Sequence, residues 1–302
     1  MSFTASDVKK LREKTGCGMM DCKKALTESN GDEEKAIDFL RKQGLAAANK
    51  KSGRIASEGA AFAKSTRSGG TIIEINSETD FVAKNNEFKK FVELCASMII
   101  DHKPNDVESL LSLKVKNGTQ SLNDVLNEKI LKIGENIKVR RFSYFEGLTA
   151  SYIHAEGKIA VLVGFSSDSD LFDNEMFKMM SRDVAMQIAA INPLYLNQSD
   201  VPAEVLEHEK SILMEQAISQ GKPQQIAERM VNGRIGKYYK ENCLMNQEFV
   251  KDSSMTISQY VEKVVSSIGC KLKVERFLRF ERGEGLEKKS ENFADEVSKI
   301  LS

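Results

Sequence analysis

The stretch from Ser77 to Phe88, SETDFVAKNNEF, places a carboxylate beside a large apolar ring where a helix is expected to begin. Ser77 and Thr79 are types that often cap helices, and Asp80 stands three residues after Ser77, as in a capping box. Phe81 precedes Phe88 by seven residues, so its ring is either the first core residue of the helix or is held in solvent for another molecule to receive. The residues alone leave both readings open.

The sequence shows no motif typical of covalent catalysis. The sequence has no GxSxG, P-loop, HExxH or strand-linked GxGxxG motif. His102, His154 and His208 are isolated, and the five cysteines form no CxxC pair, so neither a zinc site nor a disulfide framework is predicted. His102 and His208 are expected in solvent. His154 is expected in a turn between two subdomains, where a lone histidine is more often structural. We therefore predict that the protein is not an enzyme.

The composition is that of a globular protein of two or three domains. The 302 residues are 41% hydrophobic and 29% charged. The 44 basic and 44 acidic residues cancel, which argues against a dedicated nucleic-acid binder but leaves room for a local basic patch. No stretch approaches the roughly 20 apolar residues of a membrane span. The N-terminal stretch lacks the apolar core of a signal peptide. Scattered cysteines fit a reducing compartment, so a cytoplasmic protein is predicted.

Residues 1–44 are predicted to form a compact domain of three helices. Thr4 and Asp7 give a start signal, Asp21–Leu26 is a second helix, Asp32 caps the third, and Gly44 is expected to end it. A linker over 45–57 follows. Its basic residues are Lys50, Lys51 and Arg54. The linker is either a solvated hinge or a contact for an acidic surface.

An internal repeat organises the rest. IGENIKVRRF from Ile133 matches IGCKLKVERF from Ile268 at an offset of 135, and FKKFVELCASMI from Phe88 aligns with FKMMSRDVAMQI from Phe177 at an offset of 89. The first FKKF segment carries apolar residues at spacings of three and four, as an amphipathic helix does. We predict an α+β fold of two related subdomains, 58–147 and 148–285, each a small sheet with helices on one face.

Two further helical segments are predicted. The offset grows from 89 at the Phe88 match to 135 at the Ile133 match, so the second subdomain carries an insertion at about 200–248. This insertion is predicted to form an antiparallel helical hairpin around a QGKP turn. Its facing apolar residues are expected to be Val205, Ile212, Leu213 and Ile218 in one arm and Ile226, Met230 and Ile235 in the other. Residues 286–302 are predicted to end in a short amphipathic helix.

Five stretches resemble the elongation factor Ts family of bacteria. They are LREKTGCGMMDCKKAL (11–26), TDFVAKN (79–85), KIGENIKVRR (132–141), GKPQQIAERMVNGR (221–234) and FERGEG (280–285). The resemblance covers essentially the whole chain, in order. It implies a ubiquitin-associated-like N-terminal domain, a duplicated α+β core with small antiparallel sheets, a coiled-coil hairpin and a C-terminal helical module.

The resemblance also implies a function, guanine-nucleotide exchange on elongation factor Tu. The family binds the GDP-bound factor and promotes GDP release, and GTP then reloads the nucleotide-free factor. Thr79, Asp80, Phe81 and Val82 would form the exchange element. In that case Phe81 acts as a wedge between helices of the partner, and Asp80 disturbs the groups that hold its magnesium. The magnesium is lost from Tu, so no cofactor or metal site is expected in this chain.

Other contact residues are also implied by the resemblance. Met19, Met20 and Lys23 would touch the nucleotide domain of Tu, His154 matches a junction histidine of the family, and Phe249 and Val250 match a segment that contacts its far domain. Lys251 stands where family members carry methionine, so this end of the segment departs from the family pattern. Neither a membrane nor direct nucleic-acid binding is expected. The stoichiometry with Tu, one-to-one or two-to-two, stays open, as does whether the hairpin contacts Tu or a second copy.

Three alternatives come from other classes. A ubiquitin-binding adaptor would explain the three-helix domain but needs neither TDFVAKN nor a duplicated core. An RNA-binding translation protein would use the basic linker, and steeply salt-dependent RNA binding would favour it. An unrecognised enzyme would need catalytic constellations that the sequence lacks. Recovery of a nucleotide-free G protein from extract would discriminate among them.

Overall fold

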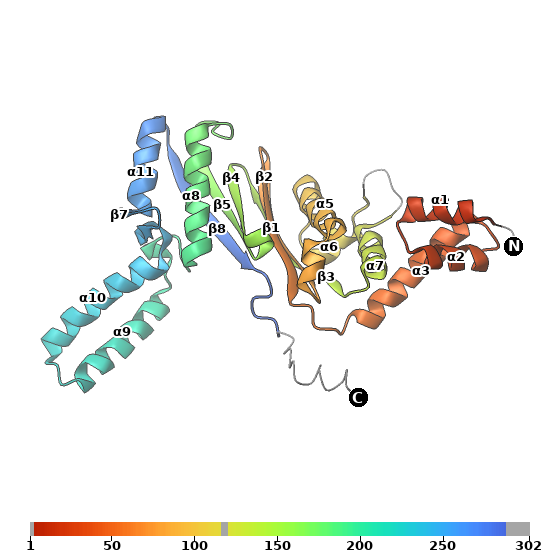
Figure 1. Cartoon of the computed structure of the whole chain (residues 1–302). Coiled ribbons are helices and arrows are strands. Elements are labelled where there is room, and N and C mark those ends of the chain that lie inside the picture. The colour runs from red at the N-terminus through yellow and green to blue at the C-terminus, as the bar shows by residue number, and fades with distance from the viewer. Residues whose placement is uncertain (1–2, 116–119, 288–302) are drawn as a thin grey trace.

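The computed structural model describes residues 3–115 and 120–287, and its first helices form the predicted N-terminal unit (Figure 1). They are α1 (Ala5–Thr15), α2 (Met19–Glu28) and α3 (Glu33–Lys51). The predicted starts are confirmed: Thr4 and Asp7 form a capping box on α1, and the Asp32 carboxylate accepts the N–H of Lys35 on α3.

The predicted end of α3 at Gly44 is wrong, because the helix continues to Lys51 through the first part of the predicted linker. Gly44 is buried where α3 crosses α7 (Leu122–Ile133). A Cβ placed on Gly44 would lie 3.2 Å from the carbonyl oxygen of Asn127. The missing side chain therefore allows a close approach of two helices, and it does not mark a helix end.

The first repeat is an antiparallel sheet with helices packed on one face. Its strands, in the order β1-β2-β3, are β1 (Glu58–Thr66), β2 (Gly69–Ser77) and β3 (Ile137–Glu146). Its helices are α4 (Asp80–Lys84), α5 (Asn86–His102), α6 (Val107–Ser112) and α7. The apolar stripe expected after Phe88 is confirmed, and Phe88, Phe91, Val92, Cys95, Met98 and Ile99 are all buried in α5.

The second repeat has the same plan. Its strands, in the order β4-β5-β8, are β4 (Thr149–His154), β5 (Ile159–Ser167) and β8 (Leu272–Glu281). Helices α8 (Glu175–Ile191) and α11 (Ile257–Ile268) pack on it, together with a small ribbon of β6 (Glu248–Phe249) and β7 (Asp252–Thr256).

The duplication predicted from sequence is confirmed by the positions of the elements. The bounds of α5 and α8 differ by 89 residues, and those of β3 and β8, like those of α7 and α11, differ by 135. Each sheet also has a register shift at an equivalent place, between Glu74 and Ile75 in one and between Gly164 and Phe165 in the other.

The two sheets pack face to face, so the core consists of four layers: helices, sheet, sheet, helices (Figure 1). Small side chains such as Ala61, Ala63 and Ala160 line the central layer. Each repeat places an arginine on a phenylalanine of the other. Arg141 of β3 lies over Phe280 of β8, and Arg276 of β8 lies over Phe145 of β3, each 4.2 Å from the ring centroid. The repeats therefore meet through equivalent surfaces.

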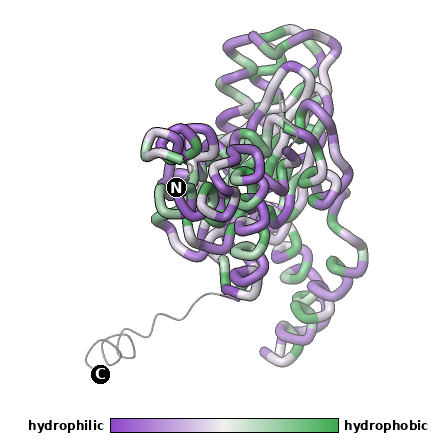
Figure 2. The backbone as a smooth tube through the Cα atoms, turned by 90° about the vertical axis from the view of Figure 1, so that its right-hand side faces the viewer, coloured by the Kyte–Doolittle hydropathy of each residue, from purple (hydrophilic) through white to green (hydrophobic). Residues whose placement is uncertain are grey.

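The helical hairpin projects from the second repeat as α9 (Ala203–Ser219) and α10 (Gln224–Asn242) (Figure 1). The hairpin carries a mixture of apolar and polar residues (Figure 2). Ile235 is buried as expected, whereas Ile218 and Ile226 are 56% and 48% exposed, so their predicted contact is wrong. Ala217 and Ala227 are buried instead, and their small side chains form the seam near the tip, which leaves the neighbouring isoleucines one position away from it.

The predicted C-terminal helix lies outside the described residues. In the described ranges, no helix is long and apolar enough to cross a membrane.

Candidate functional site

The ring of Phe81 lies in solvent, 77% exposed, on the short helix α4. Asn85 ends α4 and caps α5, and its extended backbone (φ −70°, ψ 129°) separates the two helices. In one continuous helix Phe81 would share a face with the buried Phe88. Because the chain breaks between them, the ring leaves the apolar stripe, and of the two readings of Phe81 the solvent-exposed one is correct.

The opposite face of α4 anchors it to the first repeat. Val82 and Ala83 are buried, and Val82 packs in the same cluster as Ile73 and Phe88. The isopropyl group of Val82 is therefore not available on the surface, although the residue was placed in the predicted exchange element. Its burial holds the exposed ring on a fixed support.

The capping box expected between Ser77 and Asp80 is not formed. Ser77 is the last residue of β2 and fully buried, and its hydroxyl donates to the carbonyl of Thr79 at 3.0 Å. Thr79 occupies the N-cap position, but its hydroxyl makes no cap bond to α4. Because Ser77 still belongs to the strand, the cap position of α4 falls on Thr79.

Thr79 is instead held by a carboxylate from another loop. Glu135 follows α7, and its two oxygens accept the N–H and the hydroxyl of Thr79, at 2.9 and 2.7 Å. Beside this pair the N–H of Asn136 donates to Glu78 Oε1 at 2.6 Å, and Arg54 of the predicted linker pairs with the same Glu78 oxygen at 3.3 Å. The loop before α4 is thus tied to the loop after α7.

Asp80 and Lys84 form an ion pair on the exposed side of α4, with Nζ 2.9 Å from Oδ2. The hydrogen bond from Lys84 lowers the pKa of Asp80, and the charge of Arg282 lowers it further. The same ammonium lies 6.0 Å from the centre of the Phe81 ring. Both charged side chains are about half exposed, so the pair adds little to stability. It does place a carboxylate and an aromatic ring side by side, accessible to another molecule.

His154 is brought toward this region by the turn between β4 and β5. It ends β4, it is exposed, and its Nδ1 lies 3.1 Å from the hydroxyl of Tyr152. Ala155 and Glu156 follow with φ of 46° and 52°, and Gly157 packs so closely on β1 that a Cβ there would lie 3.1 Å from Ala60. A turn of the second repeat therefore rests on the first repeat. The other two histidines are exposed, as predicted.

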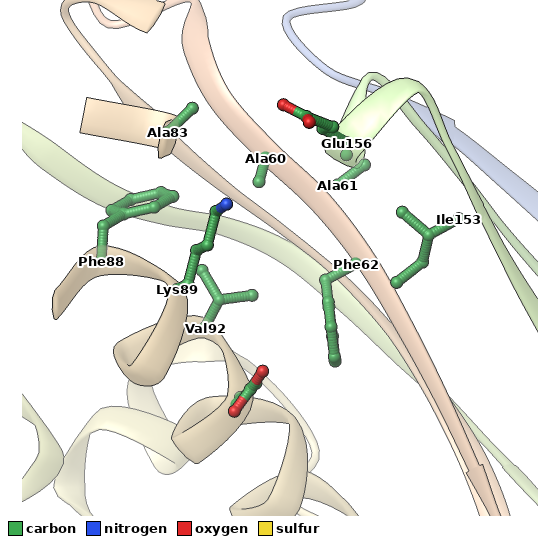
Figure 3. Close-up of a pocket in the computed structure, with 11 residues that line it drawn as sticks. Ala60, Ala61, Phe62, Ala83, Phe88, Lys89, Val92, Ile153 and Glu156 are labelled. Atoms are coloured by element: carbon green, nitrogen blue, oxygen red, sulfur yellow. The ribbon is translucent and has the colours of Figure 1, made fainter. Parts of the chain in front are cut away.

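A cavity of about 200 Å³ lies between that turn and α5 (Figure 3). Its lining is mainly apolar, with Lys89, Glu93 and Glu156 supplying charge. Ala83 lines the cavity from α4 and Ile153 lines it from β4. The structure thus brings the α4 segment and the strand of His154 to one place, although they are distant in sequence.

Met19 and Met20 are exposed at the start of α2, by 51% and 73%, and Lys23 is also exposed, as expected for a contact surface. The loop before them approaches the first repeat: a Cβ placed on Gly16 would lie 3.3 Å from Nζ of Lys132 in α7. Since Lys132 in turn pairs with Glu87 at the start of α5, at 3.4 Å, the N-terminal domain is docked near α4 through α7.

The segment around Phe249 lies at the opposite end of the core, beside α11 (Figure 1). Phe249 is only 5% exposed, and its ring stacks on Tyr260 with centroids 4.4 Å apart. Its prediction as a surface contact is wrong for the ring, which belongs to the core, whereas Val250 is 49% exposed. Lys251 donates to Asp183 at 2.7 Å. The departure from the family pattern at Lys251 therefore places an ion pair on this surface.

These features define a class of protein. Exposed apolar and charged residues are displayed at separate places along a duplicated α+β scaffold, as in a protein that docks on another macromolecule, and residues 3–115 and 120–287 contain no cluster of three or more potential metal ligands. The model of the family "Elongation factor TS" matches residues 78–284. The chain belongs to the elongation factor Ts family.

Relatives over the whole length agree. The elongation factor Ts of Clostridium perfringens (strain SM101 / Type A) is 49% identical over 303 residues, 99% of each chain. That of Clostridium acetobutylicum is 48% identical over 304 residues, covering 99% of this chain and 98% of its own. That of Trichlorobacter lovleyi is 45% identical over 305 residues, with the same shares.

Sequence reasoning missed the partners of the α4 segment. Glu78 and Glu135 were passed over as ordinary charged residues, and Met179, 65% exposed on α8, was read only as part of a helix. The repeat itself carried a signal for Glu135, because the matching position in IGCKLKVERF is Cys270. A charged residue that one repeat has and the other lacks marks a place where the two halves differ in role.

Proposed function

We propose that the protein is a guanine-nucleotide exchange factor that binds GDP-bound elongation factor Tu, promotes release of GDP and leaves the nucleotide-free factor to take up GTP. Membership of the elongation factor Ts family supports the partner. The observation that carries the mechanism is the exposed ring of Phe81 on a helix anchored by Val82 and Ala83. An apolar ring kept in water on a fixed support is suited to enter a pocket of a partner.

The mechanism follows from how G proteins hold nucleotide. Phosphates are gripped by magnesium and backbone amides, so a small displacement of those groups weakens the grip. In this proposal Phe81 is the wedge that displaces them, and the Asp80 carboxylate competes with groups that hold the metal. Binding of nucleotide and binding of the exchange factor each weaken the other by the same factor, so GTP in turn displaces the exchange factor. No covalent step is required.

The other exposed residues would hold the complex together. Met19, Met20 and Lys23 are proposed to contact the nucleotide domain, with His154 near the exchange element and Val250 on the far domain. Methionine side chains adapt to irregular apolar surfaces, which suits the first two to that role. A buried Phe249 would act by supporting Val250.

Release of fluorescent GDP from elongation factor Tu tests the proposal. The wild-type protein should accelerate release, and Phe81→Ala should reduce the acceleration by about 30-fold, since a central aromatic anchor contributes about 2 kcal/mol or more. Leu45→Ala is the matched control, because it removes an exposed side chain from α3 (50% exposed). Asp80→Ala should give a smaller loss. No acceleration by the folded wild type would reject the proposed function.

A further inference from the structure

Two loops of the first repeat are joined by paired hydrogen bonds. Glu135 accepts from both donors of Thr79, and Glu78 accepts from the N–H of Asn136. Each loop thus gives one carboxylate to the other. The contacts close a gap of 56 and 58 residues in sequence, so neither is a local turn.

The second repeat contains only half of this arrangement. Asp168 Oδ1 accepts the N–H of Lys271 at 3.0 Å, and the N–H of Asp168 donates to the carbonyl of Lys271 at 3.2 Å. By the offsets of the repeats, Asp168 and Lys271 correspond to Glu78 and Asn136. This contact joins the same two loops in both halves, so it belongs to the common frame of the fold.

The other half of the arrangement occurs only in the first repeat. Ser169 and Cys270 stand at the positions of Thr79 and Glu135, and a thiol cannot accept two charge-assisted hydrogen bonds as a carboxylate does. The second repeat has no helix at the position of α4. Leu171 matches the buried Val82, since each accepts the N–H of the asparagine that caps the next helix, and the exposed Asp170 stands at the position of Phe81. The extra carboxylate therefore coincides with the extra helix and with the ring that the helix displays.

We propose that Glu135 is a positioning residue for nucleotide exchange: its two-pronged grip on Thr79 fixes the start of α4, so that Asp80 and Phe81 are presented in one orientation. A helix of a single turn has almost no stability of its own and takes its orientation from its ends and its buried face. Asn85 fixes the end of α4, Val82 and Ala83 fix its face, and Glu135 fixes its beginning. The inference rests on the proposed function of Phe81.

The test separates the rate of exchange from binding. GDP release from elongation factor Tu is followed at increasing concentrations of each variant, which gives a maximal rate and a half-saturating concentration. Glu135→Ala should lower the maximal rate about tenfold, the effect of losing one to two charge-assisted hydrogen bonds. Thr79→Val, which keeps the side-chain volume but removes the hydroxyl, should show a smaller loss. Thr79→Ser retains both donors and should lose less of the maximal rate than Thr79→Val.

Asp168→Ala is the matched control, since it removes a carboxylate from the equivalent loop of the second repeat. It should lower thermal stability about as much as Glu135→Ala and leave the maximal rate unchanged. A wild-type maximal rate in Glu135→Ala would overturn the inference. So would a loss in Glu135→Ala that Asp168→Ala reproduces, or a Thr79→Ser as impaired as Thr79→Val.

Hydrogen exchange of the free protein distinguishes this inference from the proposed function. In Glu135→Ala the amides of Phe81 to Lys84 should exchange faster, while those of the second repeat remain unchanged. If amides of α4 exchange faster in Glu135→Ala but the wild-type protein does not accelerate GDP release, the proposed function is rejected, whereas the positioning of α4 by Glu135 stands. Unchanged exchange at α4 would reject the grip itself.

Discussion

The two repeats share one frame and differ at one segment. Helices α5 and α8 have the same length and end at residues in the left-handed region, Lys103 and Asn192. Directly before these helices the halves diverge, because Phe81 displays a ring that is 77% exposed on α4, whereas the second repeat has no helix there and carries the exposed Asp170 at that position. The same position thus carries an exposed apolar ring in one half and an exposed carboxylate in the other. In the proposed function, this divergent segment of the first repeat is the exchange element.

A second difference lies in the sheets. Glu74 is fully buried at the register shift of β2, where it accepts hydrogen bonds from Arg140, Arg141 and the N–H of Gly283. Its counterpart in β5 is Gly164, which has no side chain to offer. The first repeat therefore holds a buried carboxylate that binds the end of the second repeat to it, and the second repeat has no equivalent.

The largest effect is expected from removing that carboxylate. Glu74→Ala removes the fully buried carboxylate that Arg140 and Arg141 share and, within the described residues, leaves each arginine with its polar contact to Glu284 alone. Breaking a buried ion pair in this way costs about 3 to 5 kcal/mol. The free energy of unfolding, measured by chemical denaturation, should fall by that amount. Glu74→Gln should be milder because its amide oxygen still accepts hydrogen bonds. A loss below about 1 kcal/mol in Glu74→Ala would show that water replaces the carboxylate.

Alanine variants in the segments before α5 and α8 should separate stability from function. Leu171→Ala opens a cavity in the second repeat and should lower the free energy of unfolding by about 3 kcal/mol. Phe81→Ala should change it by less than about 0.5 kcal/mol, since its ring is in solvent. Thermal unfolding and GDP release measured on both variants should give opposite patterns. A destabilised Phe81→Ala would mean that the ring packs on the protein in solution.

Equal effects are expected where the repeats are alike. Ser121 caps α7 and Thr256 caps α11, each in a capping box and 135 residues apart. Ser121→Ala and Thr256→Ala should each cost about 1 kcal/mol. Denaturation of the two single variants and the double variant should show nearly additive losses, because the caps lie in different repeats. A clear inequality would indicate that one helix is supported more by its packing than by its cap.

The smallest effect should come from acid. Lys129 and Lys132 lower the pKa of the Glu87 carboxyl from 4.5 to about 2, whereas the counterpart of Glu87 in α8 is Met176. A depressed pKa stabilises the fold fully above the ordinary value, and the contribution is lost as the pH falls from 4.5 toward 2. Hydrogen exchange between about pH 6 and pH 3 should therefore show α5 loosening relative to α8, after correction for the intrinsic rates. Glu87→Gln should abolish the difference.

The frame was largely predictable from the sequence, because the repeat offsets and the apolar spacing after Phe88 follow directly from residue types. The end of α3 was predicted wrongly because a glycine at a helix crossing cannot be distinguished in sequence from a glycine at a helix end. Ile218 and Ile226 were placed in the hairpin seam because large apolar residues were preferred over the alanines that form it. The grip of Glu135 on Thr79 could not be predicted, since it depends on how two distant loops meet.

The position of Glu74 also sets an order of events during synthesis. Its partner Gly283 lies 209 residues further along the chain, so a ribosome makes the carboxylate long before the N–H that completes its hydrogen bonding. Until then the Glu74 carboxylate in β2 lacks one of the hydrogen bonds that it accepts in the folded protein. The first repeat is synthesised first, but it reaches its final packing only after β8 has been synthesised. The face of its sheet that packs on the second repeat therefore stays exposed during most of translation.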